Sequence, residues 1–411
     1  MLIPEDFLKK EEDHVEGFSP EVAVVTYAGG EKLEKGLVLR PTSETIIYDT
    51  FSKWIQSHRD LPLLINQWAN VIRWEMRPRL FLRTTEFLWQ EGHTAHSTEE
   101  EADLFAKTML EVYRAFAEDV MAIPTVSGLK SESEKFAGAL KTYSIETMMQ
   151  DGKALQFATS HNLGQNFSKV FNVQFTNDNG ESSCVWQTSW GLSTRTIGGL
   201  IMVHGDDRGI ILPPKISPIK VVIMPMWKSE KTKNVVLNKS KELHDMLVNK
   251  YGNSSIILDD RDVRIGQKHY HWEKRGVPIR IEIGPRDVDN NSFVLVRRDT
   301  SEKQTVELSN LTNTIEHLLD EIQKNLYLIA KKRQEDNIVD VKTWPEFVEN
   351  IESGKFVRAY WDENPETEKQ IKDKTKATVR CLPLKYSETK EGTCVFSGRK
   401  ATKKFIFARS Y

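Results

Sequence analysis

Apolar positions recur at helical spacing in "HSTEEEADLFAKTMLEVYRAFAEDVMAI", which is the clearest helix that the sequence predicts. Ser97 and Glu100 form a candidate capping box at its start. Its predicted apolar stripe consists of Phe105, Met109, Val112, Phe116 and Val120. Short strands of antiparallel character are predicted around this helix at residues 36–39, 71–75, 86–90, 183–187 and 199–203. The prolines of "RGIILPPKISPIK" then end a first unit, which we place at residues 1–215.

A second unit, residues 216–335, alternates strand and helix, which is typical of a small α/β domain. In "GVPIRIEIGPRD" the residues Val277, Ile279, Ile281 and Ile283 share one face of a predicted strand, and Arg280 and Glu282 share the other. A helix with Ser309 as its N-cap closes the unit. Its predicted apolar stripe is Leu311, Ile315, Leu318, Ile322 and Leu326. Residues 336–411 are rich in lysine and predict a compact appended α+β module.

Composition narrows the class of protein. A chain of 411 residues with 39% hydrophobic and 28% charged residues is typical of a globular protein of two or three domains. The net charge of −2 means that a nucleic acid would have to meet local basic surface. The sequence contains only three cysteines and no apolar run that could span a membrane, and "MLIPEDFLKKEEDHVEGF" lacks the apolar core of a signal peptide. We therefore expect a cytoplasmic protein without a membrane partner.

Three arginines stand out within apolar or glycine-rich text. Arg73 and Arg83 lie in "NVIRWEMRPRLFLRTTEFLWQEGH", and Arg195 lies in "SWGLSTRTIGGLIMVHGDDRG". The sequence contains no glycine-rich phosphate loop, so bound phosphate would have to be held by side chains, for which guanidinium groups are suited. The alternative is that Arg73 pairs Glu75 or Glu86 in a cross-strand salt bridge, as an arbitrary Arg-x-Glu pair usually does.

Two shorter polar stretches could line a pocket. "LVLRPTSETIIY" places Thr42 and Glu44 between a predicted strand and a predicted helix. The alternative is a capping role, with Ser43 or Thr42 as the N-cap and Glu44 in the first helical turn. "LQFATSHNLGQNF" gathers Gln156, Thr159 and His161, although a lone histidine of this kind is more often structural than catalytic.

Together these residues resemble a class II aminoacyl-tRNA synthetase, and more narrowly a prolyl-tRNA synthetase of the archaeal and eukaryotic cytosolic type. "VIRWE" followed by "FLRTTEF" is similar to motif 2 of the class, and "GLSTRTIGGLIMVHGDDRG" is similar to motif 3. The prolyl assignment rests on "RPTSE", "FLWQEGH", "EKFAG", "TSHNLGQNF", "HGDDRGIILPP", "GVPIRIEIGPRD" and the final "RSY", which occur in this order over nearly the whole chain.

The resemblance implies a fold and a reaction. The fold is α/β with α+β parts: a class II antiparallel sheet with helices at 1–215, a small α/β anticodon-binding domain at 216–335, and a C-terminal α+β module at 336–411. The reaction is the activation of L-proline with ATP and Mg²⁺, followed by transfer of proline to the 3′ end of tRNA(Pro). Another class II synthetase, or a synthetase-like tRNA-binding protein without catalysis, remains the alternative.

The resemblance also implies a role for each matching residue. Arg73 and Arg195 are the expected catalytic residues. The ATP-binding residues are expected to be Arg73, Glu75, Arg83, Thr84, Phe87, Gln156, Thr159, Ser193 and Arg195, with Gln156 also near the Mg²⁺ that bridges the phosphates. The proline-binding residues are expected to be Thr42, Glu44, Arg73, Trp89, Glu91, Phe136 and His161. The anticodon is expected to meet Lys268, Glu273, Arg280 and Lys303, unless Arg280 and Glu282 only form a solvated strand face.

Two departures from the family pattern affect these expectations. The segment that carries motif 1 and builds the dimer interface precedes the point that "MLIPEDFLKKEEDHVEGF" matches, so a homodimer is expected only if that segment is present. Many relatives bind structural zinc through four cysteines in the C-terminal module, where this chain offers Cys381 and Cys394. We therefore expect no structural zinc.

Overall fold

The computed structural model describes residues 1–7, 22–386 and 391–411 of the chain. It contains two compact units. The first is formed by Met1–Ala115, Thr125–Gly199 and Asp336–Tyr411, and the second by Phe116–Pro124 and Leu200–Glu335. The C-terminal segment, which the sequence suggests is an appended module, therefore folds together with the first segment of the chain. Among the described residues, no helix combines the length and apolarity that a membrane span needs.

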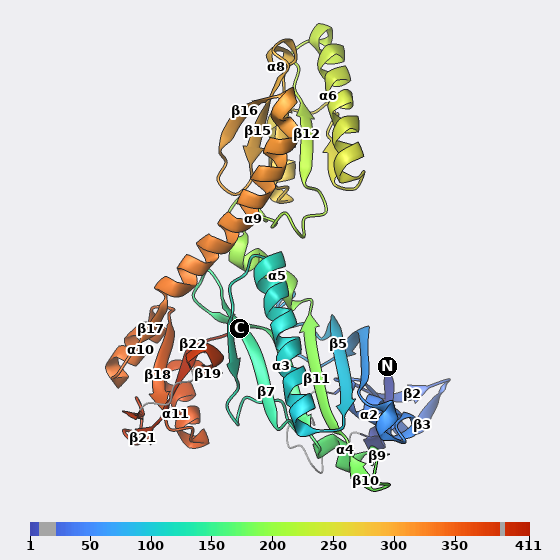
Figure 1. The fold of residues 1–411 in the computed structure, drawn as a ribbon. Helices are drawn as coiled ribbons and strands as arrows, with labels where there is room; N and C mark the ends of the chain where they lie inside the picture. The colour runs from blue at the N-terminus through green and yellow to red at the C-terminus, as the bar shows by residue number, and fades with distance from the viewer. Residues whose placement is uncertain (8–21, 387–390) are drawn as a thin grey trace. The chain divides into compact units, whose positions relative to one another are not determined.

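A ten-stranded sheet is the frame of the first unit (Figure 1). Its strands, in hydrogen-bonded order, are β17 (Ile338–Asp340), β18 (Phe356–Trp361), β22 (Lys403–Arg409), β19 (Ala377–Pro383), β6 (Val126–Leu129), β7 (Lys141–Met148), β8 (Ala154–Gly164), β11 (Trp186–Ser193), β5 (Glu86–His96) and β4 (Leu63–Ile72). Only the β17–β18 pair in this sheet is parallel. The sheet is therefore continuous from the N-terminal half of the chain into its C-terminal segment.

The junction between these two parts is the pairing of β6 with β19. Leu129 lies opposite Leu382, and Gly128 lies opposite Pro383. A Cβ atom on Gly128 would lie 2.4 Å from the Sγ of Cys381, so only glycine allows the strands to approach this closely. The junction thus depends on a small residue on one strand and a buried thiol on the other.

Helix α3 (Glu99–Ala115), followed by the π-helical turn η3 (Phe116–Val120), packs against β7, β8 and β11. Its buried residues are Ala102, Ala106, Leu110 and Tyr113. The apolar stripe was predicted on the wrong face of the helix, since Val112, one of its members, is 50% exposed. The small alanines bring the helix backbone so close to the sheet that Ser160 on β8 donates a hydrogen bond to the Ala106 carbonyl at 2.7 Å.

Two further predictions about local structure are corrected. The run 199–203, predicted as a strand, belongs to helix α5 (Arg195–His204), because a short apolar run fits a buried helix as well as a strand. A Cβ atom on Gly199 would lie 3.0 Å from Leu155, so glycine lets α5 approach β8. The predicted capping pair of Ser97 and Glu100 is not the one seen: Thr98 Oγ1 accepts from the Glu101 amide at 3.2 Å, and the Glu101 carboxylate accepts from the Ser97 amide at 3.3 Å.

The first unit contains further helices and strands outside this sheet. The N-terminal elements are β1 (Leu2–Pro4), β2 (Val24–Ala28), β3 (Glu31–Leu39), α2 (Glu44–Trp54) and η2 (His58–Asp60). Between β8 and β11 lie α4 (Asn166–Val170), β9 (Gln174–Thr176) and β10 (Ser182–Cys184). The C-terminal segment adds α10 (Trp344–Glu352), α11 (Pro365–Thr375), η5 (Leu384–Tyr386), β20 (Gly392–Thr393) and β21 (Lys400–Ala401).

The second unit is built on a five-stranded sheet in the order β13, β12, β14, β15, β16. Its elements are β12 (Val221–Pro225), α6 (Glu230–Tyr251), β13 (Ile256–Leu258), α7 (Ile265–Lys274), β14 (Ile279–Ile283), α8 (Pro285–Asp289), β15 (Ser292–Arg297), β16 (Lys303–Glu307), η4 (Leu308–Asn310) and α9 (Leu311–Asp336). The predicted stripe of α9 is confirmed, since all five of its residues are buried. Ser309 is not its N-cap, because that residue lies within η4.

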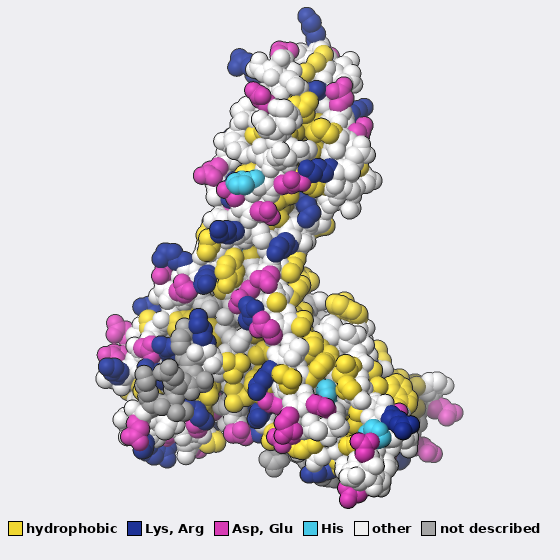
Figure 2. All heavy atoms as spheres, in the orientation of Figure 1, with side chains coloured by type: hydrophobic (Ala, Val, Ile, Leu, Met, Phe, Trp, Pro, Cys, Tyr) yellow, Lys and Arg dark blue, Asp and Glu magenta, His cyan; other side chains and the backbone are white. Residues whose placement is uncertain are grey.

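On the face shown in Figure 2, basic and acidic side chains are interspersed, as the formal net charge of −2 suggests. A charged ligand would therefore be met by a local arrangement of side chains, and the interior of the first unit contains such an arrangement.

Candidate active site

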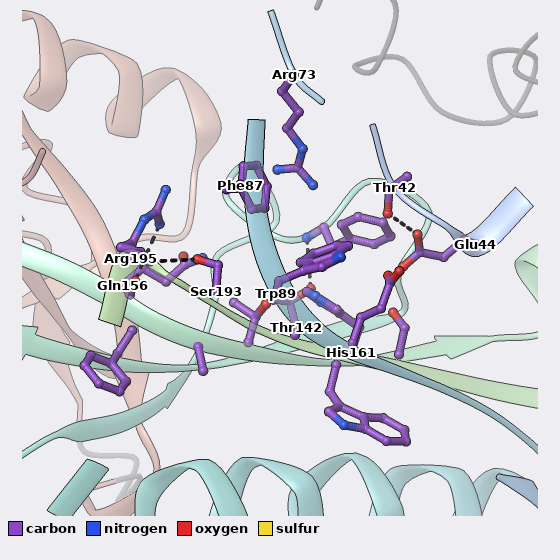
Figure 3. Close-up of a pocket in the computed structure, with 18 of the residues that line it drawn as sticks. Thr42, Glu44, Arg73, Phe87, Trp89, Thr142, Gln156, His161, Ser193 and Arg195 are labelled. Atoms are coloured by element: carbon purple, nitrogen blue, oxygen red, sulfur yellow. Dashed lines mark hydrogen bonds between the residues drawn. The ribbon is translucent and has the colours of Figure 1, made fainter. Parts of the chain in front are cut away.

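A cavity of about 260 Å³ opens in the first unit over β5, β8 and β11 (Figure 3). Alternate residues of a strand share a face, so Phe87, Trp89 and Glu91 on β5 all line this cavity. A second cavity of about 160 Å³ shares residues Arg73 and Arg195 with the first. In Figure 3, Thr42 and Glu44 lie at one end, with Gln156 and Arg195 at the other.

The predicted site residues are brought together here. All seven predicted proline-binding residues line the first cavity. Of the predicted ATP-binding residues, Arg73, Phe87, Ser193 and Arg195 line both cavities, Gln156 and Thr159 line the first, and Glu75, Arg83 and Thr84 line the second. The sequence did not single out the further lining residues Glu134, Thr142, Phe157, Ala158, Ser189, Trp190 and Gly191.

Arg73 lies one residue beyond the end of β4, not within a strand as the run 71–75 predicts. Its Nε donates to the Pro41 carbonyl at 3.0 Å, and its guanidinium carbon lies 5.5 Å from the centre of the Phe87 ring. The salt bridge considered from the sequence is not the arrangement seen. Glu75 instead pairs Arg83 at 3.5 Å, and Glu86 accepts from Asn70 at 2.7 Å.

Arg195 begins α5 and points into the same space. Its Nε donates to the Leu82 carbonyl at 3.0 Å, and its Nη1 to the Gln156 carbonyl at 3.5 Å. Burial, and then the positive charges of Arg83 and Arg73, lower the pKa of Arg195 to about 10. The guanidinium remains charged at neutral pH, so three cations converge on one pocket. An anion bound there would relieve their mutual repulsion.

Two buried carboxylates lie at the opposite end of the pocket. Thr42 Oγ1 donates to Glu44, and Ser43 Oγ donates to Glu91. The capping alternative is right about position, since Ser43 is the N-cap residue of α2 and Glu44 lies in its first turn, but Ser43 makes no side-chain capping bond. Both hydroxyl groups donate hydrogen bonds to carboxylates, so this end of the pocket is small, acidic and suited to a cationic group.

A polar network beneath the pocket holds Glu91, and the sequence did not reveal it. Gln67 Nε2 donates to Glu91 at 2.6 Å, and His93 Nε2 lies 3.1 Å from the other carboxylate oxygen. Burial acts to raise the pKa of Glu91, but His93, Ser43 and Gln67 outweigh burial and lower it. The register of β4 with β5 places Gln67 opposite Glu91 and would have revealed this contact. Register is set by tertiary pairing, however, and cannot be derived from the sequence of either strand alone.

Aromatic side chains form the wall between these ends. The His161 ring lies 4.7 Å from that of Phe136, and Thr142 Oγ1 lies 3.0 Å from His161 Nδ1. Burial, and then His93 and Arg73, lower the pKa of His161 to about 3. His161 is therefore neutral at physiological pH. Within the described residues, three buried polar atoms of the lining residues have no hydrogen-bond partner: Trp89 Nε1, Ser189 Oγ and Trp190 Nε1.

A second cluster of charges, in the second unit, contains most of the predicted anticodon residues. Arg280 donates to Glu273 at 2.7 Å and to Glu282 at 2.9 Å, and Lys303 donates to Glu282 at 3.1 Å. The solvated-face alternative is wrong for Glu282, which is only 5% exposed. The ammonium of Lys268 is buried and donates to the Asp259 carbonyl at 2.8 Å, so its charge is used within the fold.

The cysteines of the C-terminal segment lie in its interior. Cys381 on β19 is buried, and burial raises the pKa of its thiol to about 12. Cys394 is also buried, in the core formed with α10 and α11. In residues 1–7, 22–386 and 391–411, no cluster of three or more His, Cys, Asp or Glu side chains is placed to hold a metal ion. The expectation about zinc stays a prediction.

Comparison with known proteins identifies the family. The proline–tRNA ligase of Chloroherpeton thalassium is 53% identical over 419 residues, which cover 100% of this chain and 86% of that protein. The chain belongs to the prolyl-tRNA synthetase family. The proline–tRNA ligase of Parabacteroides distasonis, 51% identical over 426 residues with the same coverage, is a second relative. Both organisms are bacteria, so these relatives support the family but not the archaeal and eukaryotic type.

Family models match all three parts of this synthetase. They are "tRNA synthetase class II core domain (G, H, P, S and T)" over residues 27–204, "Anticodon binding domain" over 220–318, and "Prolyl-tRNA synthetase, C-terminal" over 344–411. A crystal structure of the prolyl-tRNA synthetase from Cryptosporidium parvum, complexed with halofuginone and AMPPNP, is 42% identical with a TM-score of 0.92. The match covers 100% of this chain and 84% of the chain in that crystal structure. The expected fold class is confirmed.

Proposed function

We infer that this chain is an aminoacyl-tRNA ligase that activates L-proline with ATP and transfers it to tRNA(Pro). The observation that carries the inference is a pair of adjoining cavities with Arg83 and Arg195 at one end, Arg73 in the middle and two buried carboxylates at the other end. Proline has one negative and one positive group, and ATP brings further negative charge. The charge order of the pocket therefore matches both substrates placed end to end.

Arg73 is the proposed catalytic residue for adenylate formation. It lies between the two ends of the pocket, against the faces of Phe87 and Trp89. There it can bind the proline carboxylate and the α-phosphate together. Attack of the carboxylate oxygen on the α-phosphorus forms prolyl-adenylate and releases pyrophosphate. A fixed guanidinium stabilises the negative charge that develops during this step.

Glu44 and Thr42 are proposed to bind the secondary ammonium of proline. The Glu44 carboxylate is buried and already oriented by the Thr42 hydroxyl, so little reorganisation would be needed to receive a cation. Phe136, Trp89 and His161 would enclose the ring. Glu91, fixed by its own network, would keep this end of the pocket acidic.

The other end of the pocket is proposed to bind ATP. Arg195 and Arg83 would hold the outer phosphates, Phe87 would stack on adenine, and Glu75 and Thr84 would contact the base or phosphates. Gln156, Thr159 and Ser193 would complete the site. The oxygen-bearing side chain of Gln156 fits a hard cation, so Gln156 would contact the Mg²⁺ that neutralises the phosphates.

The tRNA anticodon is proposed to meet the charge cluster of the second unit. Arg280, Glu273 and Lys303 each carry donors or acceptors that could read base edges in a splayed loop. The three are partly exposed, unlike Lys268, which we leave out of the contact surface because its charge is buried.

Four broader features complete the proposal. We propose functional domains at 1–215, 216–335 and 336–411, and the archaeal and eukaryotic type of architecture, which the similarity to the Cryptosporidium parvum enzyme supports. We also propose a homodimer when the segment that carries motif 1 is present, with the exposed Trp68 and Leu88 of the edge strand β4 and its neighbour β5 facing a second copy. A cytoplasmic location agrees with the three free cysteines.

The activation step is tested by amino-acid-dependent exchange of pyrophosphate into ATP. Exchange with proline, and not with the other amino acids in turn, is the expected result. Exchange that depends on threonine, glycine or histidine would instead favour another class II synthetase. A folded sample without exchange for any amino acid would favour the non-catalytic tRNA-binding alternative.

A further inference from the structure

A triad of buried charges joins the catalytic sheet to the C-terminal segment. Glu146 on β7 pairs Lys130 at 2.7 Å, between Nζ and Oε1. On its other oxygen, Glu146 accepts from Arg380 of β19, at 3.0 Å from Nε and 2.8 Å from Nη2. The side chains of Lys130 and Glu146 are 1% and 0% exposed, and that of Arg380 is 7% exposed. The pocket described above does not include any of the three.

Burying such a triad of charges makes an unfavourable contribution to the free energy of folding. Removing charged groups from water costs several kcal/mol for each ion, and apolar residues of similar size often stabilise a protein as well or better. Burial acts to raise the pKa of Glu146, but Arg380 and Lys130 outweigh burial and lower it, so the carboxylate is charged. The stability of the unit alone is therefore a weak explanation for the triad.

One arm of the triad leads to the proline end of the pocket. Lys130 directly precedes the segment that carries Phe136, and its amide donates to the Thr142 carbonyl at 2.9 Å. The amide of Phe136 donates to the Thr142 hydroxyl, also at 2.9 Å. Next to Lys130, Ser131 Oγ donates to Glu368 of α11 at 3.2 Å. The segment is thus attached at its start to both β7 and the C-terminal segment.

The other arm leads to the ATP end. Glu146 lies directly opposite Gln156 in the pairing of β7 with β8. Gln156 lines the pocket, and its carbonyl accepts from Arg195. The charge of Glu146 also acts to raise the pKa of Arg195, against the larger effect of burial. The carboxylate of the triad is therefore close enough to influence the guanidinium proposed to bind phosphate.

We propose that Arg380 of the C-terminal segment is a positioning residue for proline activation, acting through Glu146 on both ends of the pocket. It holds the Glu146 carboxylate against Lys130, which lies at the start of the segment that carries Phe136. Glu146 also lies opposite Gln156, whose carbonyl accepts a hydrogen bond from Arg195. The C-terminal segment then contributes to the chemistry without touching either substrate. This inference rests on the proposed function.

The test compares three variants in the pyrophosphate exchange assay. Arg380→Met is expected to lower kcat/KM by about 10–100-fold, with a raised KM for ATP, because small displacements of binding groups are costly. Arg380→Lys should recover part of this loss. The triple variant Lys130→Met/Glu146→Leu/Arg380→Met removes all three charges. Its unfolding temperature should equal or exceed that of the wild type, while its kcat/KM should stay low. Arg358→Met, which removes an ion pair with Asp340 in the same segment, is the control.

The outcomes separate the possible accounts. An active-site titration corrects every rate for the folded fraction, so a purely structural role would lower the number of active sites and leave both KM values unchanged. A well-folded triple variant with wild-type kinetics would overturn the proposal, and it decides the matter if Arg380→Met does not fold. Wild-type enzyme without proline-dependent exchange would instead be a failure of the proposed function.

Discussion

The two charge clusters of this protein use arginine in opposite ways. In the second unit, Arg280 is paired with two carboxylates, and Glu282 with Arg280 and Lys303. In the pocket of the first unit, Arg195 is held by backbone carbonyls and lies near two further cations. Arg280 is therefore neutralised by carboxylates, whereas Arg195 is held by neutral carbonyl groups beside two further cations and would gain from an anion.

The pKa values express the same difference. Burial acts to raise the pKa of Glu282, but His269, Lys303 and Arg280 hold it at about 2, which reflects stable pairing. The pKa of Arg195 is lowered to about 10 by burial and by its cationic neighbours, which reflects repulsion. Removing a charge should therefore affect catalysis in the first cluster and RNA recognition or stability in the second.

The largest effect is expected from Arg73→Ala. The substitution removes the guanidinium proposed to contact both reacting groups, so proline-dependent exchange should fall by at least about 10²–10³-fold. Circular dichroism should show an unchanged fold. Arg79→Ala, an arginine of the same loop that lines neither cavity, is the matched control. Residual exchange near the wild-type rate would remove Arg73 from the proposed mechanism.

Glu44→Gln should have the next largest effect. Loss of the negative charge should raise the KM for proline by about 10–100-fold, the usual worth of a hydrogen bond to a charged group, and should leave the KM for ATP nearly unchanged. Steady-state exchange kinetics with each substrate varied in turn measure both constants. Equal changes in the two KM values would indicate general damage to the pocket instead.

Arg280→Ala should separate the two clusters most directly. Proline-dependent exchange should be unchanged, whereas aminoacylation of tRNA(Pro) should slow by about 10-fold, because one polar contact to a base edge is lost. Arg297→Ala on β15 is the control, since Arg297 also pairs carboxylates in the second unit. If both variants charge tRNA equally well, Arg280 does not read the anticodon.

The smallest effect concerns acid stability. A carboxyl group whose pKa is lowered on folding stabilises the protein above its unfolded pKa, here about 4.5 for Glu282, and this stabilisation is lost as the pH falls towards about 2. Urea unfolding between these pH values should show a steeper loss of stability for wild type than for Glu282→Gln. Parallel curves would show that the pairing of Glu282 contributes little.

Local patterns and motif blocks predicted much of this protein. The helical stripe from Leu311 to Leu326, the alternating strand around Ile281, and the arginines at 73, 83 and 195 were all visible in the sequence. Local patterns did not determine which face of α3 is buried or that residues 199–203 are helical. Those outcomes depend on what packs against each segment.

The sequence by itself therefore determined the family, the order of its parts and the residue types of the pocket, because these depend on short stretches with fixed spacing. Only the tertiary structure decided that β19 joins β6, that Gln67 holds Glu91, and that Arg380 reaches Glu146. Each of these depends on strand register and on pairs of residues far apart in the chain. Local periodicity does not contain that information, because a shift of one residue in register turns every side chain to the opposite face.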